Sequence, residues 1–136
     1  MADKEIIIMF ACIHNAGRSQ MASALFNKYK TKSNVKGISA GTEPADHVHP
    51  NVVQAMNELH DIDLSQVEPT LLTAELAKTV DTIVTMGCNE KCPYVPGVKI
   101  IDWKIPDPKN SDYKGTIDIH NYIESLIKEY IETNQY

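Results

Sequence analysis

The chain has 136 residues, a formal net charge of −5 and a hydrophobic fraction of 43%. This length predicts one domain over residues 1–136, with chain enough for one buried core. The negative charge argues against binding to nucleic acid or to a membrane surface, and no apolar run is long enough to span a bilayer.

The chain begins with an apolar run and a polar loop. Residues 6–11 are all apolar, which suits a central strand of a parallel sheet. The loop then carries Cys12, Arg18 and Ser19 in the pattern Cys-x5-Arg-Ser, and a helix is predicted over residues 18–29. Backbone N–H groups at such a helix start bind oxyanions, and an arginine fork grips two oxygens. The same groups favour a cysteine thiolate, so the segment predicts a nucleophilic sulfur facing phosphate, arsenate or sulfate.

Predicted strands and helices alternate along the rest of the chain. Further strands are expected at residues 35–40, 82–86 and 99–101. Helices are expected from Pro50, with Val52, Met56 and Leu59 at helical spacing, at residues 73–78, and across an amphipathic C-terminal segment. This alternation predicts an α/β fold in three layers, a four-stranded parallel sheet with helices on both faces. Ligands in such folds bind beyond the carboxyl ends of the strands.

The loop after the last predicted strand carries a candidate general acid. Asp107 stands between Pro106 and Pro108, which restrict the backbone on both sides. A carboxyl held above a thiolate can protonate a leaving oxygen. A plain turn is the alternative reading, because Asp and Pro are turn residues. Asp102 competes for the acid role, and Trp103 is expected to pack.

The loop of residues 87–97 carries two of the three cysteines. On a regular helix the Cβ atoms of Cys88 and Cys92 would lie about 5–6 Å apart, whereas a disulfide needs about 3.5–4.5 Å. The pair can bond only where the segment departs from helix. Two unrelated thiols are one alternative, and half of a metal site is another. A zinc site would need Cys12 and His14, which would consume the nucleophile, so we predict no metal and no cofactor.

Three thiols around one oxyanion site allow a relay. Cys12 would attack the bound anion, and Cys88 would then attack Cys12 and expel the reduced product. Cys92 would resolve the resulting disulfide, and an external thiol reductant would restore the start. A phosphatase needs only Cys12, Arg18 and Asp107.

Residues 12–22 resemble the active-site loop of thioredoxin-coupled arsenate reductases, which share the fold of low-molecular-weight protein tyrosine phosphatases. Further segments resemble landmarks of this family: residues 39–41, 48–50, 61–65, 84–86 and 107–108. The resemblance implies reduction of arsenate to arsenite in arsenic detoxification. It implies Cys12 as nucleophile, Asp107 as acid, and Cys88 and Cys92 as the second and third relay cysteines. The loop implied to bind the substrate comprises His14, Asn15, Ala16, Gly17, Arg18 and Ser19.

The resemblance leaves the reductant open between thioredoxin, glutaredoxin and a small thiol, because Cys88 and Cys92 are closer together than the corresponding cysteines of well-studied members. Ser23 replaces the acidic residue through which some members bind potassium, so no such ion is predicted. The alternative function is a low-molecular-weight tyrosine phosphatase or small phosphomonoesterase. A thiol-redox sensor is a third reading.

The N-terminal segment carries charges directly into the first strand without a signal-peptide pattern, which predicts a cytoplasmic protein with reduced thiols. A monomer is the default expectation. The remaining histidines are expected at surface or structural positions: His47, His49, His60 and His120.

Overall fold

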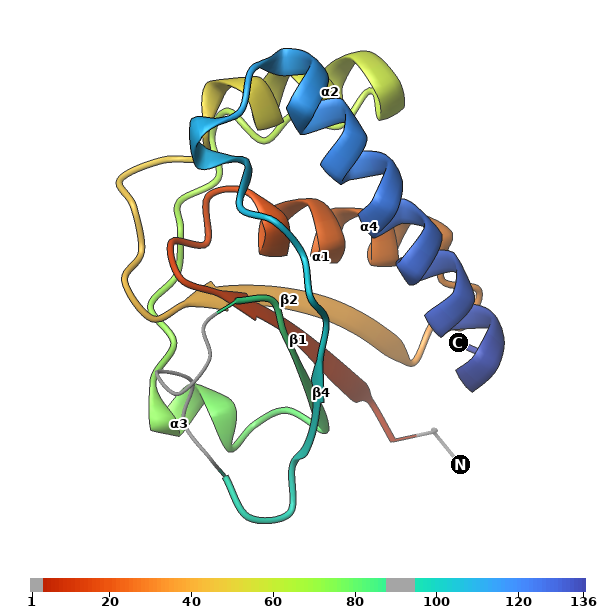
Figure 1. Cartoon of the computed structure of the whole chain (residues 1–136). Helices are drawn as coiled ribbons and strands as arrows, with labels where there is room; N and C mark the ends of the chain where they lie inside the picture. Colours follow the sequence, from red (N-terminus) through yellow and green to blue (C-terminus); the bar gives the residue numbers. More distant parts are fainter. Residues whose placement is uncertain (1–3, 88–94) are drawn as a thin grey trace.

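The computed structural model describes residues 4–87 and 95–136. Its centre is a parallel sheet of four strands in the order β2-β1-β3-β4. The strands are β1 (Ile6–Cys12), β2 (Val35–Gly41), β3 (Thr82–Thr85) and β4 (Lys99–Asp102). The four-stranded parallel sheet predicted from the sequence is therefore confirmed (Figure 1).

The helices begin and end at residues with clear local signals. Pro50 is the first residue of its helix, and Asp61 ends that helix in the left-handed conformation. The carboxylate of Asp112 accepts a hydrogen bond from the Gly115 N–H at 2.7 Å and so caps the last helix. The helices are α1 (Arg18–Tyr29), α2 (Pro50–His60), α3 (Ala74–Ala77), the 3-10 helix η2 (Pro108–Asn110) and α4 (Tyr113–Asn134).

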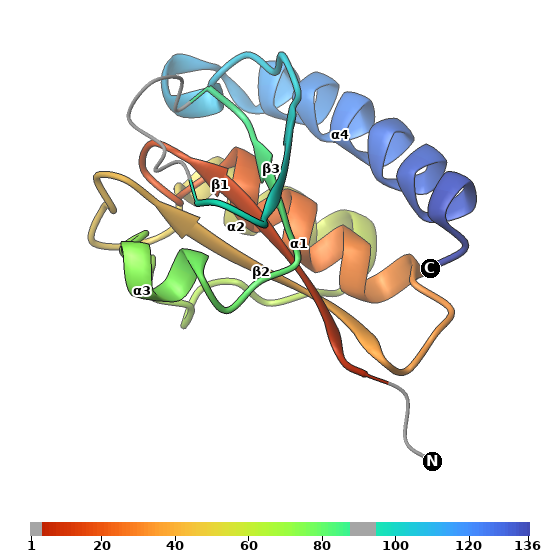
Figure 2. The same cartoon turned by 90° about the horizontal axis from the view of Figure 1, so that it is seen from below.

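The two faces of β1 belong to two separate hydrophobic clusters. Ile8 and Phe10 point to the face covered by α1 and α4, whereas Met9 and Ala11 point to the face covered by α3. Successive side chains of a strand alternate between faces, which explains why all of this strand had to be apolar. Figure 1 shows α1, α2 and α4 on one side of the sheet with α3 on the other, and Figure 2 views the sheet from the α3 side.

The last turn of α2 differs from the sequence prediction. Leu59, expected on the apolar face, is 46% exposed, whereas Val52, Ala55 and Met56 are buried. The side chain of His60 is only 5% exposed and takes the inward position instead. A buried histidine pair therefore replaces an aliphatic contact between α2 and α4, because the inward partner on α4 is His120.

Among the residues that the structure describes, no helix combines the length and apolar character needed to cross a membrane.

Candidate active site

The thiol of Cys12 lies at the carboxyl end of β1 and is 2% exposed. Its Sγ is 2.9 Å from the Ser19 hydroxyl, and the Asn15 backbone N–H donates to the same sulfur at 3.3 Å. The Ser19 oxygen accepts a hydrogen bond from the Asn15 side-chain amide at 2.7 Å, which leaves the hydroxyl proton to point at the sulfur. Two donors thus stabilise negative charge on the Cys12 sulfur.

Asn15 holds the loop in shape. It is fully buried and has a φ of 49°, in the left-handed region that asparagine tolerates better than most residues. Its side-chain oxygen accepts hydrogen bonds from the Thr70 N–H at 2.9 Å and from the Gln20 amide at 3.1 Å. Gln20 also donates to the Asn15 carbonyl at 3.0 Å. The loop is therefore held by Gln20 in the first turns of α1 and by Thr70, which is 55 positions away in the sequence.

Arg18 is the first residue of α1 and is buried, 5% exposed. Its Nη1 donates to the Ile105 carbonyl at 3.1 Å, and its Nη2 lies 3.5 Å from a carboxylate oxygen of Asp107. Within the described part of the chain its Nε has no hydrogen-bond partner. Arg18 is therefore a buried residue of the site and not a surface residue. Its Nε–H remains available to donate a hydrogen bond to a bound anion.

Gly87 makes room for that guanidinium. A Cβ at this position would lie 2.3 Å from Nη1 of Arg18, and the backbone has a φ of +94°. Both facts favour glycine, because an added side chain would collide and the left-handed region strains other residues. Cys88 is the next residue in the sequence, but Cys88 and Cys92 lie outside the described residues.

Asp107 combines the two interpretations offered by the sequence. One oxygen accepts the Lys109 N–H at 2.9 Å and starts η2, as a turn residue does, while the other faces Arg18. Its competitor Asp102 is held by Thr85 at 2.7 Å and Lys104 at 2.8 Å. The hydrogen bond from Lys104, followed by that from Thr85, lowers the pKa of Asp102 below its ordinary value. Asp102 is thus poorly suited to donate a proton near neutral pH.

The other loop residues face the neighbouring segments. Nδ1 of His14 lies 3.1 Å from the Glu43 carbonyl oxygen, and the Ala16 carbonyl accepts the His49 N–H at 2.9 Å. At Gly17 a Cβ would lie 2.8 Å from Pro108, so η2 packs directly on the loop. The structure therefore brings residues 12–19 and Asp107 together. Sequence reasoning missed the supporting roles of Gln20 and Gly87, although each adjoins a residue that it singled out.

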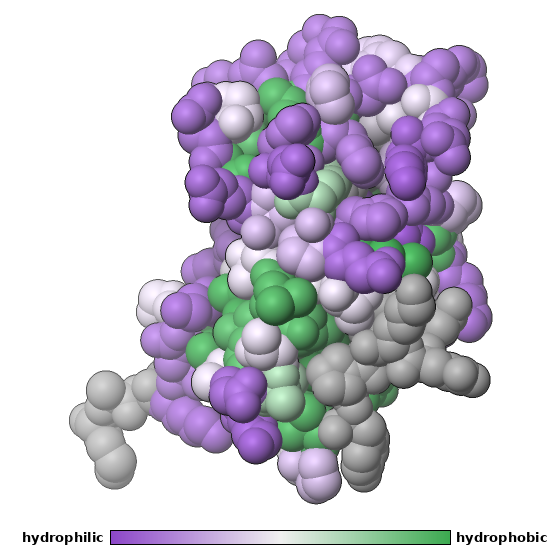
Figure 3. Space-filling view, turned by 90° about the vertical axis from the view of Figure 1, so that its left-hand side faces the viewer, coloured by the Kyte–Doolittle hydropathy of each residue, from purple (hydrophilic) through white to green (hydrophobic). Residues whose placement is uncertain are grey.

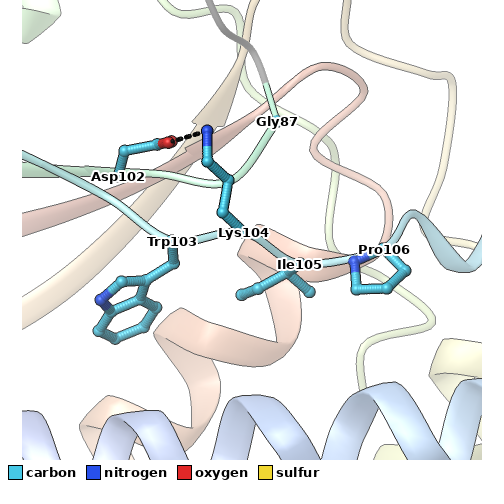
Figure 4. A pocket seen from close by; sticks show the side chains of 6 residues that line it. All are labelled: Gly87, Asp102, Trp103, Lys104, Ile105 and Pro106. Carbon is cyan, nitrogen blue, oxygen red and sulfur yellow. Dashed lines mark ion pairs between the residues drawn. The ribbon is translucent and has the colours of Figure 1, made fainter.

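A hollow of about 320 Å³ opens beyond the carboxyl ends of β3 and β4. Its walls are Gly87 and residues 102–106 (Figure 4). Two of these residues approach Arg18, because the Ile105 carbonyl accepts a hydrogen bond from Nη1 and a Cβ at Gly87 would collide with the same atom. Trp103 packs on Phe10 with ring centroids 6.1 Å apart, as expected for a packing residue. Figure 3 shows the side of the molecule toward which the strands run, with hydrophobic residues gathered below the middle of this face.

His49 adds a titratable group at the same edge. Burial lowers its pKa below the ordinary histidine value, and the negative charge of Asp107 opposes that shift. His49 is thus favoured in its neutral form near neutral pH.

The parallel sheet and the Cys-x5-Arg loop at its carboxyl edge are the features of a phosphatase-like α/β protein. The model of the low molecular weight phosphotyrosine protein phosphatase family matches residues 7–135, and the chain belongs to this family. The family resemblance predicted from the loop is therefore confirmed.

Relatives within this family carry a more specific name. A putative arsenate reductase of Halobacterium salinarum is 32% identical, over 93% of this chain and 91% of the relative. A glutaredoxin arsenate reductase of Synechocystis is 27% identical, over 92% of each. The solved structure of a thioredoxin-dependent arsenate reductase of Corynebacterium glutamicum is 34% identical with a TM-score of 0.82. It matches 99% of this chain, which spans 64% of the length of that protein.

Proposed function

We propose that this chain is a cytoplasmic, monomeric enzyme that reduces arsenate to arsenite through a relay of Cys12, Cys88 and Cys92. The observation that carries the proposal is the buried Cys12 thiol, which receives two hydrogen bonds beside a buried Arg18. Gly87 lies against that arginine and directly precedes Cys88 in the sequence. The names of the relatives support arsenate as the oxyanion.

In the first step the Cys12 thiolate attacks the arsenic of bound arsenate. An As–O bond breaks, and the leaving oxygen takes a proton from Asp107 and departs as water. Arg18 and the backbone N–H groups of the loop balance the charge on the remaining oxygens. The product is a Cys12–S–As(V) adduct, and no electrons have yet moved to arsenic.

In the second step the Cys88 thiolate attacks the Cys12 sulfur. An S–S bond forms and the S–As bond breaks with its electron pair on arsenic, which reduces As(V) to As(III) and releases arsenite. Cys92 then attacks Cys88, frees the Cys12 thiolate and leaves a Cys88–Cys92 disulfide. Two thiols lose two electrons and arsenic gains two, so each turnover consumes one external dithiol or two molecules of a small thiol.

The reductant is a dithiol protein of the thioredoxin or glutaredoxin type, or a small thiol. The thioredoxin-dependent relative and the glutaredoxin relative support the two protein candidates equally. A relay of free thiols recycled in this way fits the reducing conditions of the cytoplasm.

The first test follows NADPH consumption with arsenate, thioredoxin and thioredoxin reductase. Wild type is expected to turn over continuously, Cys92→Ser to release about one equivalent of arsenite, and Cys12→Ser none. The Cys92→Ser variant stops after one cycle because the Cys12–Cys88 disulfide cannot be resolved. Without turnover, glutaredoxin with glutathione replaces thioredoxin in the same assay.

Hydrolysis of an aryl phosphate separates this proposal from the phosphatase alternative. Cys88→Ser is expected to lose arsenate reduction and to keep phosphate-ester hydrolysis, which needs only Cys12, Arg18 and Asp107. Full arsenate turnover in Cys88→Ser would exclude the relay. Either activity persisting in Cys12→Ser would exclude the site.

A further inference from the structure

A second cluster of chemically active side chains lies between α2 and α4. The Nε2 atoms of His60 and His120 are 2.7 Å apart, and Nε2 of His60 is 3.5 Å from a carboxylate oxygen of Glu124. The three ligand atoms all lie within 4.8 Å of one another. The side chain of His60 is 5% exposed and His120 is 2% exposed. None of the three belongs to the cysteine chemistry above.

The fold places this cluster without help from loops. His60 is the last residue of α2, while His120 and Glu124 are one turn apart on α4 and share a face. Side chains on two packed helices are held more firmly than side chains on loops, which favours a defined binding geometry.

Surrounding hydrogen bonds orient two of the three groups. Nδ1 of His120 lies 2.9 Å from the Asn121 side-chain oxygen, which fixes the N–H on Nδ1 and leaves the Nε2 lone pair facing the cluster. The Tyr29 hydroxyl donates to the Glu124 carboxylate at 2.8 Å. Such outer partners of a histidine and a carboxylate are typical of metal sites.

We propose that His60, His120 and Glu124 bind one divalent transition-metal ion, with Zn²⁺ as the reference ion and water as the fourth ligand. Zn²⁺ binds imidazole nitrogen at about 2.0–2.1 Å and carboxylate oxygen at about 2.0–2.2 Å. Tetrahedral ligands are then about 3.3 Å apart. The distance of 3.5 Å from Nε2 of His60 to the Glu124 carboxylate oxygen already fits this geometry. The two Nε2 atoms of His60 and His120, now 2.7 Å apart, must move apart by about 0.6 Å.

Two lysines oppose the ion and give the proposal a sharp test. Nζ of Lys28 lies 2.6 Å from Nδ1 of His60, and Nζ of Lys128 lies 4.0 Å from Glu124. When a metal binds Nε2 of His60, the imidazole proton must lie on Nδ1. The Lys28 ammonium opposes this, because it also donates and needs a lone pair on that same Nδ1. Lys28 is exposed and free to turn outward. Binding then moves one proton from Nε2 to Nδ1 of His60, with no net release.

The experiment is calorimetric titration of Zn²⁺ into the chain with Cys12, Cys88 and Cys92 replaced by serine, because thiolates bind zinc themselves. One equivalent is expected. In this background His60→Gln and Glu124→Gln should each weaken binding at least about tenfold, since even outer partners contribute about 10–100-fold. His47→Gln, at an exposed histidine outside the cluster, should leave affinity unchanged.

Lys28→Met should tighten zinc binding, because it removes the ammonium group that lies against Nδ1 of His60. Zinc bound to an unrelated surface histidine would not respond to this substitution. Zn²⁺ should also raise the melting temperature of the parent but not of folded His60→Gln, because the ion ties the end of α2 to α4. No binding at micromolar zinc, or binding that survives both His60→Gln and Glu124→Gln, would overturn the proposal. Far-UV circular dichroism establishes that each variant is folded.

Discussion

At the scale of single residues, Asn15 carries both strain and hydrogen bonds. Asn15→Ala should lose about 1–3 kcal/mol of stability from unmade buried hydrogen bonds, and a further 1 kcal/mol or so from its φ of 49°. Asn15→Gly loses the same hydrogen bonds but adopts this φ freely, so it should be the more stable of the two. Urea unfolding measures the difference. Equal stability of the variants would mean that the backbone here is unstrained.

Gly87 and Gly97 form a matched pair for testing the space beside Arg18. Their φ values are +94° and +87°, but a Cβ at Gly97 would meet no atom of the described residues within 4 Å. Both alanine variants should lose about 1–2 kcal/mol of stability from the backbone conformation. Gly87→Ala alone should also weaken phosphate or arsenate binding, because its methyl group displaces Nη1 of Arg18. Calorimetry with phosphate tests this, and equal binding by both variants would contradict it.

The candidate site was predictable from sequence where its residues are close along the chain. Cys12, Arg18 and Ser19 stand in one loop and helix start, so their pattern and the local dipoles suffice. The Thr70 N–H that fixes Asn15 is 55 positions away, and nothing local indicates such a partner. Gly87 directly precedes Cys88 in the sequence, but its close approach to Arg18 depends on the packing of two strands.

At the scale of elements, local signals predicted the boundaries well. The first helix runs over residues 18–29 as expected, and Pro50 starts the second. β3 ends at Thr85, one residue before the predicted end, because the chain turns at Gly87. The Met86 N–H still donates a hydrogen bond to the Ala11 carbonyl. The strand order and the inward choice of His60 over Leu59 depend on contacts between distant segments, which periodicity does not contain.

The buried face of α4 provides a test of how that helix contributes to stability. Ile123 is fully buried among the residues that face α1, whereas its neighbour Tyr122 is 46% exposed. Ile123→Ala should lower the free energy of unfolding by about 2–5 kcal/mol through lost burial and a cavity. Tyr122→Ala should change it by about 0.5 kcal/mol or less. Urea denaturation of both variants gives the comparison, and similar losses would contradict the assigned face.

At the scale of the whole molecule, the lowered pKa values set how stability depends on pH. Burial lowers the pKa of His49, and hydrogen bonds lower those of Asp102 and Glu58. In each case the unfolded chain binds protons more readily than the folded chain, so acid favours unfolding. The contribution of His49 to stability is present above the ordinary histidine pKa of 6.5 and is lost as the pH falls below that value. The contributions of Asp102 and Glu58 to stability are lost only at lower pH, below the ordinary pKa values of 3.8 and 4.5 for these carboxyl groups.

Stability should therefore fall in two stages between neutral and acidic pH. His49→Gln should flatten the first stage, measured as the urea midpoint from pH 7 to pH 5. Asp107→Asn should steepen this stage or move it to lower pH, because the Asp107 charge raises the pKa of His49 and its removal lowers that pKa further. Titration of the His49 imidazole by NMR measures the shift directly. A His49 pKa that rises in Asp107→Asn would contradict the placement of these two groups at one edge of the sheet.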